Sequence, residues 1–174
     1  EDLVQQFSMQ RLSKNSPVFD YHKLRFLNNR AIQQKRSIDL YRLLFKRDSL
    51  RDRYLSFGKE KIIALIHLMK PRMKTLNDFD NKFNIYLKGE LNYNNKDLGK
   101  LAIDNMLEEN LEYLVKQMEL MDTFDKESVE NRLRDCAVQK GIPAAELIHP
   151  VRFALTSENV SPSLFEVFEF FGRD

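Results

Sequence analysis

The side chains that most often bind metals or act as nucleophiles are few in this chain of 174 residues and lie far apart. They are one cysteine and three histidines: Cys136, His22, His67 and His149. Their spacing matches neither a Cys/His zinc site nor a cysteine–histidine catalytic pair. Cys136 falls between Leu133 and Val138 on the apolar side of an expected helix, which indicates core packing. We therefore predict no metal site, no internal disulfide and a reducing compartment.

Other catalytic patterns are also missing from the sequence. It contains no glycine-rich phosphate loop, no H-x-x-x-H pair and no G-x-S-x-G turn. Glu108, Glu109 and Glu112 form an acidic group, but they fall on an expected amphipathic helix and are better explained as a solvated face. No apolar run approaches the roughly 18 residues that cross a membrane. We predict no catalytic residue, no cofactor in this chain and no membrane association.

The charges are divided unevenly along the chain. Residues 21–88 carry 17 Lys and Arg against 6 Asp and Glu, whereas residues 89–174 carry 9 against 17. A basic half within a chain of net charge +2 is typical of a surface that binds a polyanion such as nucleic acid. Solvated helix faces would produce the same pattern. Charge alone leaves both interpretations open.

The elements that must position any site are helices. Apolar residues recur at helical spacing along nearly the whole chain, and five Gly and five Pro are too few for a turn-rich β fold. The sequence therefore predicts an all-α fold, a helical bundle. Helices are expected at about residues 21–34, 37–56, 59–70, 75–87, 96–121, 126–140, 143–157 (one helix kinked at Pro150, or a pair) and 162–171.

Several residues predict where these helices begin and end. Asp20 is expected to cap the helix over 21–34, with Leu24, Leu27 and Ile32 on its inward face. Gly141 is expected to end a helix in the left-handed conformation. Ser161 and Pro162 are expected to begin the last helix as its N-cap and first residue.

Three motifs resemble, in the same order, stretches of bacterial-type glutamyl-tRNA synthetases. Residues 11–20 read R-L-S-K-N-S-P-V-F-D and residues 23–28 read K-L-R-F-L-N, where the family has approximately R-V-S-K-S-P-A-V-F-D and K-L…W-L-N. Residues 69–72, M-K-P-R, with Thr75, Leu76 and Phe79, are similar to the family's L-x-R-x-x-T-L-x-E-F.

The third motif lies near the end of the chain. Residues 150–156 read P-V-R-F-A-L-T and residues 161–166 read S-P-S-L-F-E, similar to the family's P-L-R-x-A-L-T-G and P-x-L-F-E. The sequence departs from the family at Phe26 (usually Trp), Val151 (usually Leu) and Ser157 (usually Gly). Ser157 affects the expected turn, because glycine tolerates positive φ and serine resists it.

The resemblance implies the C-terminal part of such an enzyme. Residues 1–36 would end the stem-contact region, and residues 37–90 and 91–174 would form two small helical anticodon-binding subdomains. The family attaches glutamate to tRNA(Glu) with ATP and Mg, using residues upstream of this stretch. Because both ends of the sequence look cut, we expect a monomeric cytoplasmic fragment that binds tRNA(Glu) and catalyses nothing.

The resemblance also implies which residues read the anticodon. Arg72 would face the third anticodon base; its guanidinium only donates, which suits the O2 and N3 acceptors of cytosine and opposes the N–H donors of guanine. Arg152 would face the other anticodon bases, together with Ser161, Pro162 and Leu164 at the start of the last helix. The candidates for contacts with the tRNA backbone are Lys14, Lys23, Arg25, Arg30, Lys70 and Lys74. For any of these cations, a plain solvated surface charge is the alternative.

A second function is compatible with the same sequence. The chain would then be a helical protein–protein interaction module, with its acidic long helix docking a partner and no RNA bound. Salt distinguishes the two functions, because phosphate contacts weaken steeply as salt rises. The sequence does not indicate whether the parent enzyme also charges glutamine tRNA.

Overall fold

The computed structural model describes residues 2–11, 18–46, 48–93, 106–158 and 161–173. About 75% of these residues are helical and none of them is in a strand, which confirms the all-α prediction. The helices are α1 (Asp2–Gln6), α2 (Tyr21–Gln34), α3 (Ser37–Leu44), α4 (Asp48–Tyr54), α5 (Lys59–Met69), α6 (Asp78–Lys88), α8 (Leu107–Glu119), α9 (Lys126–Lys140), α10 (Ala144–Thr156) and α11 (Leu164–Phe171), with short 3-10 turns at η1 (Met9–Arg11), η2 (Leu55–Phe57) and η3 (Lys70–Arg72). In this part of the chain, no helix is both long and apolar enough to cross a membrane.

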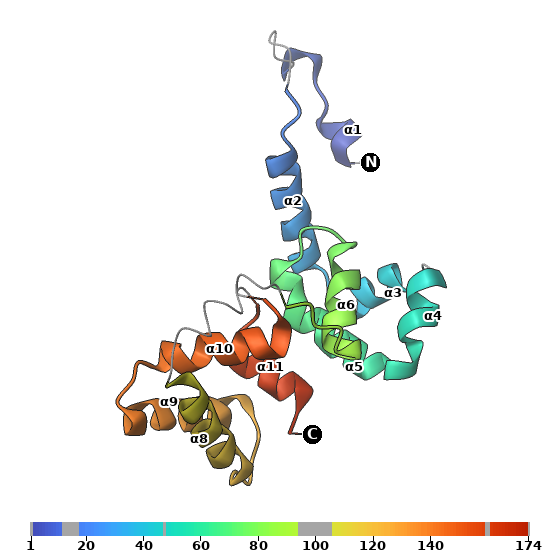
Figure 1. Cartoon of the computed structure of the whole chain (residues 1–174). Coiled ribbons are helices and arrows are strands. Elements are labelled where there is room, and N and C mark those ends of the chain that lie inside the picture. Colours follow the sequence, from blue (N-terminus) through green and yellow to red (C-terminus); the bar gives the residue numbers. More distant parts are fainter. Residues whose placement is uncertain (1, 12–17, 47, 94–105, 159–160, 174) are drawn as a thin grey trace.

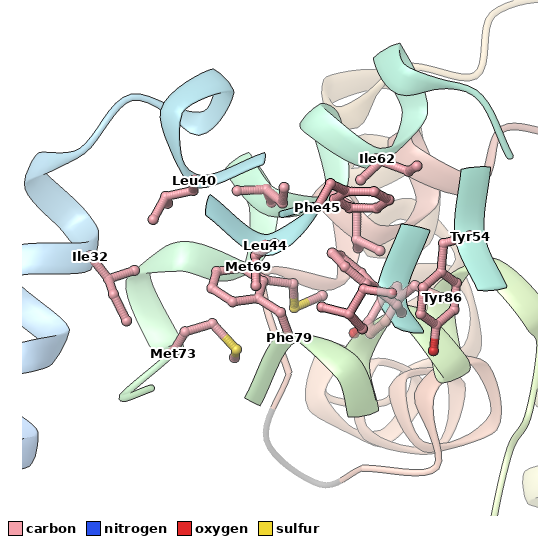
Figure 2. Packing of buried hydrophobic residues seen from close by; sticks show 14 of the residues in the cluster. Ile32, Leu40, Leu44, Phe45, Tyr54, Ile62, Met69, Met73, Phe79 and Tyr86 are labelled. Atoms are coloured by element: carbon pink, nitrogen blue, oxygen red, sulfur yellow. The ribbon is translucent and has the colours of Figure 1, made fainter. Parts of the chain in front are cut away.

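The first hydrophobic core is built by α3, α4, α5 and α6 (Figure 2). Leu65 and Ile66 of α5 are fully buried against Leu40 of α3 and Phe79 and Phe83 of α6. The buried residues recur every three or four positions along α5 (Ile62, Leu65 and Ile66, Met69) and α6 (Phe79, Phe83, Tyr86), so each of these helices presents one apolar stripe to its neighbours. This packing fixes the end of α5 and the η3 turn that follows it.

The second core is built by α8, α9, α10 and α11. Leu133 of α9 is fully buried, and Cys136 one turn later is 1% exposed, so the prediction that Cys136 packs in the core is confirmed. The last helix contributes to both cores: Leu164 belongs to the second core, whereas Val167 belongs to the first. The two cores are therefore tied together through α11, and the division at residues 1–36, 37–90 and 91–174 stays a prediction.

Helix α2 projects away from α3–α6 and from the helices of the second core (Figure 1). Asp20 caps it as expected, accepting hydrogen bonds from the backbone N–H groups of His22 and Lys23. The expectation that Leu24 and Leu27 face inward is wrong: they are 49% and 51% exposed, and only Ile32 is buried. The reason is tertiary, because only the C-terminal end of α2 reaches the body of the protein, at η3.

Of the two alternatives for residues 143–157, the structure has the single helix, α10, with Pro150 inside it. Two predicted helix limits differ from the structure. The stretch expected over 37–56 is two helices, α3 and α4. The last helix begins at Leu164 with Ser163 as its N-cap, so Ser161 and Pro162 precede it. Gly141 does end α9 in the left-handed conformation. The start of the helix expected over 96–121 falls outside the described residues.

Candidate nucleic-acid interface

Arg72 occupies a short 3-10 turn directly after the buried helix α5. Pro71 lacks a backbone N–H, so the chain leaves the α-helical hydrogen-bond pattern at this point. Met69 before the turn and Met73 after it are both buried, whereas Arg72 between them is exposed. The turn therefore presents the guanidinium to solvent from a rigid base.

Side-chain amides of α2 hold the backbone on both sides of Arg72. The Asn29 amide donates to the carbonyl oxygens of Met73 at 2.7 Å and Pro71 at 3.2 Å. The Gln33 amide donates to the Pro71 carbonyl at 3.2 Å and to the Asn29 side-chain oxygen at 2.7 Å. Asn28 adds a bond to the Lys74 carbonyl. These amides were not among the residues predicted from the sequence; their shared polar type at helical spacing on a basic helix is the only local signal for them.

A cavity of about 640 Å³ lies between α2, the η3 turn and the residues Glu158, Ser161 and Pro162. Five of the predicted site residues line it: Arg25, Arg72, Lys74, Ser161 and Pro162. They come from three separate parts of the chain, so the fold brings the motifs of the resemblance to one place. The cavity also contains two charged residues that the sequence analysis missed, Lys82 and Glu158.

Lys82 and Glu158 form an ion pair across 76 positions of sequence, between α6 and the segment after α10. Glu158 is held by the end of α10: its backbone N–H donates to the Thr156 hydroxyl at 3.2 Å, and that hydroxyl donates to the Arg152 carbonyl at 2.7 Å. Ser157, between Thr156 and Glu158, adopts a left-handed conformation with φ of 52°. No sequence pattern points to this pair, because neither partner is near the other along the chain.

Three buried polar atoms have no hydrogen-bond partner among the described residues, and one of them belongs to Glu158, which lines this cavity. Within the described residues, the Tyr86 hydroxyl, Arg152 Nε and one Glu158 carboxylate oxygen are buried and make no hydrogen bond. Burial raises the pKa of the Tyr86 hydroxyl and the Glu158 charge adds to this, while Ser161, Arg72 and Arg152 act in the opposite direction. Arg152 therefore lies close to the same cluster, although it does not line the cavity.

The other predicted residues lie outside the cavity. Leu164 is 1% exposed and packs in the second core, so its side chain is not available to a ligand. Lys70 donates to the Lys35 carbonyl at 3.3 Å, and the Arg30 guanidinium lies 6.0 Å from the ring centre of Phe26. Lys23 is exposed on α2. Lys14 lies outside the described residues.

A second cavity, of about 1120 Å³, lies between α5 and α11 and is also bordered by Arg72. Its walls include Lys61, His67 and the ion pair of Lys126 with Glu166, at 2.8 Å. Over the described part of the chain, no group of three or more His, Cys, Asp or Glu residues is placed to hold a metal ion. The cations around Arg72 are therefore suited to anions and to hydrogen-bond acceptors such as nucleobase carbonyls.

Curated relatives of this chain are glutamate–tRNA ligases. It is 30% identical over 177 residues to glutamate–tRNA ligase 2 of Koribacter versatilis, covering 100% of this chain and 36% of the relative. It is 29% identical over 175 residues to glutamate–tRNA ligase of Thermus thermophilus, with the same coverage of both. The chain thus spans about a third of the length of the relatives it matches. These matches confirm the resemblance found in the sequence.

Solved structures share the fold. A crystal structure of a glutamate tRNA ligase from Elizabethkingia meningosepticum, in complex with its amino acid, superposes with a TM-score of 0.73 at 20% identity, covering 98% of this chain and 33% of that one. Glutamate–tRNA synthetase from Elizabethkingia anophelis superposes with a TM-score of 0.66 over 98% of this chain and 32% of its own. The helical arrangement is therefore one that known proteins adopt.

A family model provides the assignment. The model described as "Anticodon binding domain" matches residues 40–174, which include the η3 turn, the α10–α11 segment, the whole second core and the first core except Ile32. The chain therefore belongs to the anticodon binding domain family.

Proposed function

We propose that this chain is the anticodon-binding part of a glutamate–tRNA ligase and that it binds tRNA(Glu) through the cavity beside Arg72. The observation that carries the proposal is the convergence of Arg25, Arg72, Lys74 and the Ser161–Pro162 segment on one cavity. Splayed anticodon bases need such a recess, with cations nearby for the phosphates. The longer protein would attach glutamate to the tRNA with ATP and Mg bound elsewhere. It would act in the cytoplasm as a monomer.

Within this function, Arg72 reads the third anticodon base. The η3 turn fixes its backbone, and no hydrogen-bond or ion-pair partner among the described residues occupies its guanidinium. Its donors match O2 and N3 of cytosine. Guanine would place N1–H and N2–H against the same donors, leaving buried groups unpaired at about 1–3 kcal/mol each. Arg152, Ser161 and Pro162 would face the other two bases.

The test compares tRNA(Glu) with the same tRNA carrying guanine as its third anticodon base. Arg72→Gln should reduce the ratio of the two affinities by about one to two orders of magnitude, because an amide both donates and accepts. Arg72→Lys should be intermediate, since lysine lacks the planar fork. Arg134→Gln, which removes an exposed arginine paired with Glu130, is the matched control and should leave the ratio unchanged. An unchanged ratio in Arg72→Gln would remove Arg72 from base reading.

The exposed apolar face of α2 supports a second candidate, a protein–protein interaction module. Leu24 and Leu27 of α2 are exposed, as is Phe19 just before the helix, and exposed apolar residues that lie together often mark a contact surface. Salt separates the two candidates: tRNA affinity should fall steeply between low and moderate salt, whereas an apolar protein contact should not.

A further inference from the structure

We call the cavity of about 640 Å³ between α2 and the η3 turn the Arg72 cavity. Among the described residues that line it, Glu158 is the only carboxylate, and the other charged residues are Arg25, Arg72, Lys74 and Lys82. One carboxylate oxygen, Oε1, pairs with the ammonium group of Lys82. The other, Oε2, is buried, and the described residues provide it with no hydrogen-bond partner. A buried acceptor without a donor is costly, so this oxygen is suited to a donor that a ligand brings.

The position of Glu158 is fixed before any ligand arrives. Its backbone N–H is bound by the Thr156 hydroxyl, and its side chain is drawn toward α6 by Lys82. Neither contact uses Oε2. A held side chain loses little conformational freedom when it makes a further bond, which favours selective recognition.

The negative charge of Glu158 limits which ligand groups can bind beside it. A phosphate would be repelled by the carboxylate, so phosphate contacts belong to Arg25 and Lys74. A nucleobase is uncharged and can offer N–H donors. With Arg72 presenting only donors to the same cavity, the cavity has a donating side and an accepting side.

Cytosine matches both sides at once. Its Watson–Crick edge places the N4 amino donor next to the N3 and O2 acceptors. Uracil places the O4 acceptor where cytosine has the amino group, and that oxygen would face the carboxylate. Arg72 alone rejects uracil only in part: uracil keeps the O2 acceptor, although its N3–H donor replaces the N3 acceptor of cytosine and opposes a donor-only group.

We infer that Glu158 is a specificity-determining residue that accepts a hydrogen bond from the amino group of a cytosine at the third anticodon position. The inference rests on the proposed function, since it assumes that this base enters the cavity. Glu158 would read the exocyclic group, the amino group of cytosine against the O4 of uracil, whereas Arg72 reads O2 and N3 and so discriminates cytosine from guanine. Lys82 is a positioning residue that occupies Oε1 and leaves Oε2 for the base.

The experiment measures the binding of anticodon stem-loop RNAs that differ only at the third anticodon base: cytosine, uracil, or pyrimidin-2-one, which is cytosine without its amino group. The wild-type chain is compared with Glu158→Gln and with Glu166→Gln. The latter is the matched control, because Glu166 pairs with Lys126 at 2.8 Å and does not line the Arg72 cavity. Circular dichroism and melting temperature report whether each variant folds.

We expect the wild type to bind the cytosine RNA about 10- to 100-fold more tightly than the uracil and pyrimidin-2-one RNAs, the range of a hydrogen bond to a charged group. Glu158→Gln should lose most of this preference, since its amide can turn its NH₂ toward O4. Glu166→Gln should keep it.

Two results would overturn the inference while leaving the proposed function intact. One is an unchanged cytosine-to-uracil ratio in folded Glu158→Gln. The other needs no variant: wild type that binds the pyrimidin-2-one RNA as tightly as the cytosine RNA. If the wild type binds none of these RNAs at low salt, the proposed function itself fails, and this inference fails with it.

Discussion

Replacing Asn29 with alanine tests whether α2 holds the loop that carries Arg72. The Asn29 amide donates to the partly buried Met73 carbonyl at 2.7 Å and to the exposed Pro71 carbonyl at 3.2 Å, and its oxygen accepts from Gln33. The structure thus places three hydrogen bonds on one side chain. Because α2 projects from the body of the protein, these bonds are a large part of what ties it to η3.

The expected cost follows from the burial of each bond. The partly buried bond to Met73 contributes about 1 kcal/mol, and the two exposed bonds contribute less, so the sum is about 1.5–2 kcal/mol. The Pro71 carbonyl keeps its bond from Gln33 in the variant, which sets the lower end of this range. If the Asn29 hydrogen bonds alone order the η3 turn for binding, losing them costs the same free energy in binding, which is about a tenfold loss of RNA affinity.

The assay combines binding with hydrogen exchange. In Asn29→Ala, the backbone amides of Lys70 and of residues 72–75 should exchange faster, while those of Leu133 and its neighbours in the second core keep their rates. Gln34→Ala, which truncates an exposed residue of the same helix, is the control. Unchanged exchange at 70–75 together with unchanged RNA affinity would refute the claim that α2 positions Arg72.

Two further predictions concern stability. Ser157→Gly should raise the free energy of unfolding by about 0.5–1 kcal/mol in urea titrations, because Ser157 has φ of 52° and glycine adopts this conformation without steric cost; a destabilised variant would contradict it. Burial raises the pKa of the Asp78 carboxyl, but hydrogen bonds from the Thr75 hydroxyl and from the backbone N–H groups of Lys74 and Thr75 outweigh it and hold the pKa below its ordinary value of 3.8. Asp78 therefore contributes stability that is complete above about pH 4 and is lost as the pH falls through its folded-state pKa. Asp78→Asn should remove this part of the acid dependence in urea titrations, and parallel pH curves for the wild type and the variant would show that the carboxyl is not involved.

The sequence alone was enough for the fold class and for most helices, because both depend on local chemistry. The spacing of apolar residues fixes which stretches are amphipathic, and caps such as Asp20 and Gly141 act within one turn of the residue itself. Motif order was enough to locate Arg72 and the Ser161–Pro162 segment, which the fold then brought to one cavity. The roles assigned to these residues stay predictions.

Local rules failed where two interactions compete for one residue. Serine at the N-cap and proline at the first helical position are typical of a helix N-terminus, so Ser161 and Pro162 were expected to begin α11. The helix begins at Leu164 instead, and the Ser161 hydroxyl donates to the Pro162 carbonyl. Both Ser161 and Pro162 are buried, so packing of the segment between α10 and α11 takes precedence over its capping preference. Likewise, Leu24 and Leu27 define an apolar face, but periodicity does not indicate whether that face has a partner.

Only the tertiary structure decided the pairing of Lys82 with Glu158 and the placement of the three amides of α2 against η3. These contacts join positions that are 76 and about 40 residues apart, and no local pattern encodes them. They exist because the two cores, joined through α11, bring α6 against the end of α10, and because the buried Ile32 anchors the end of α2 at the first core. Periodicity within a helix determines which side chains share a face, whereas the packing of helices against one another determines which faces meet.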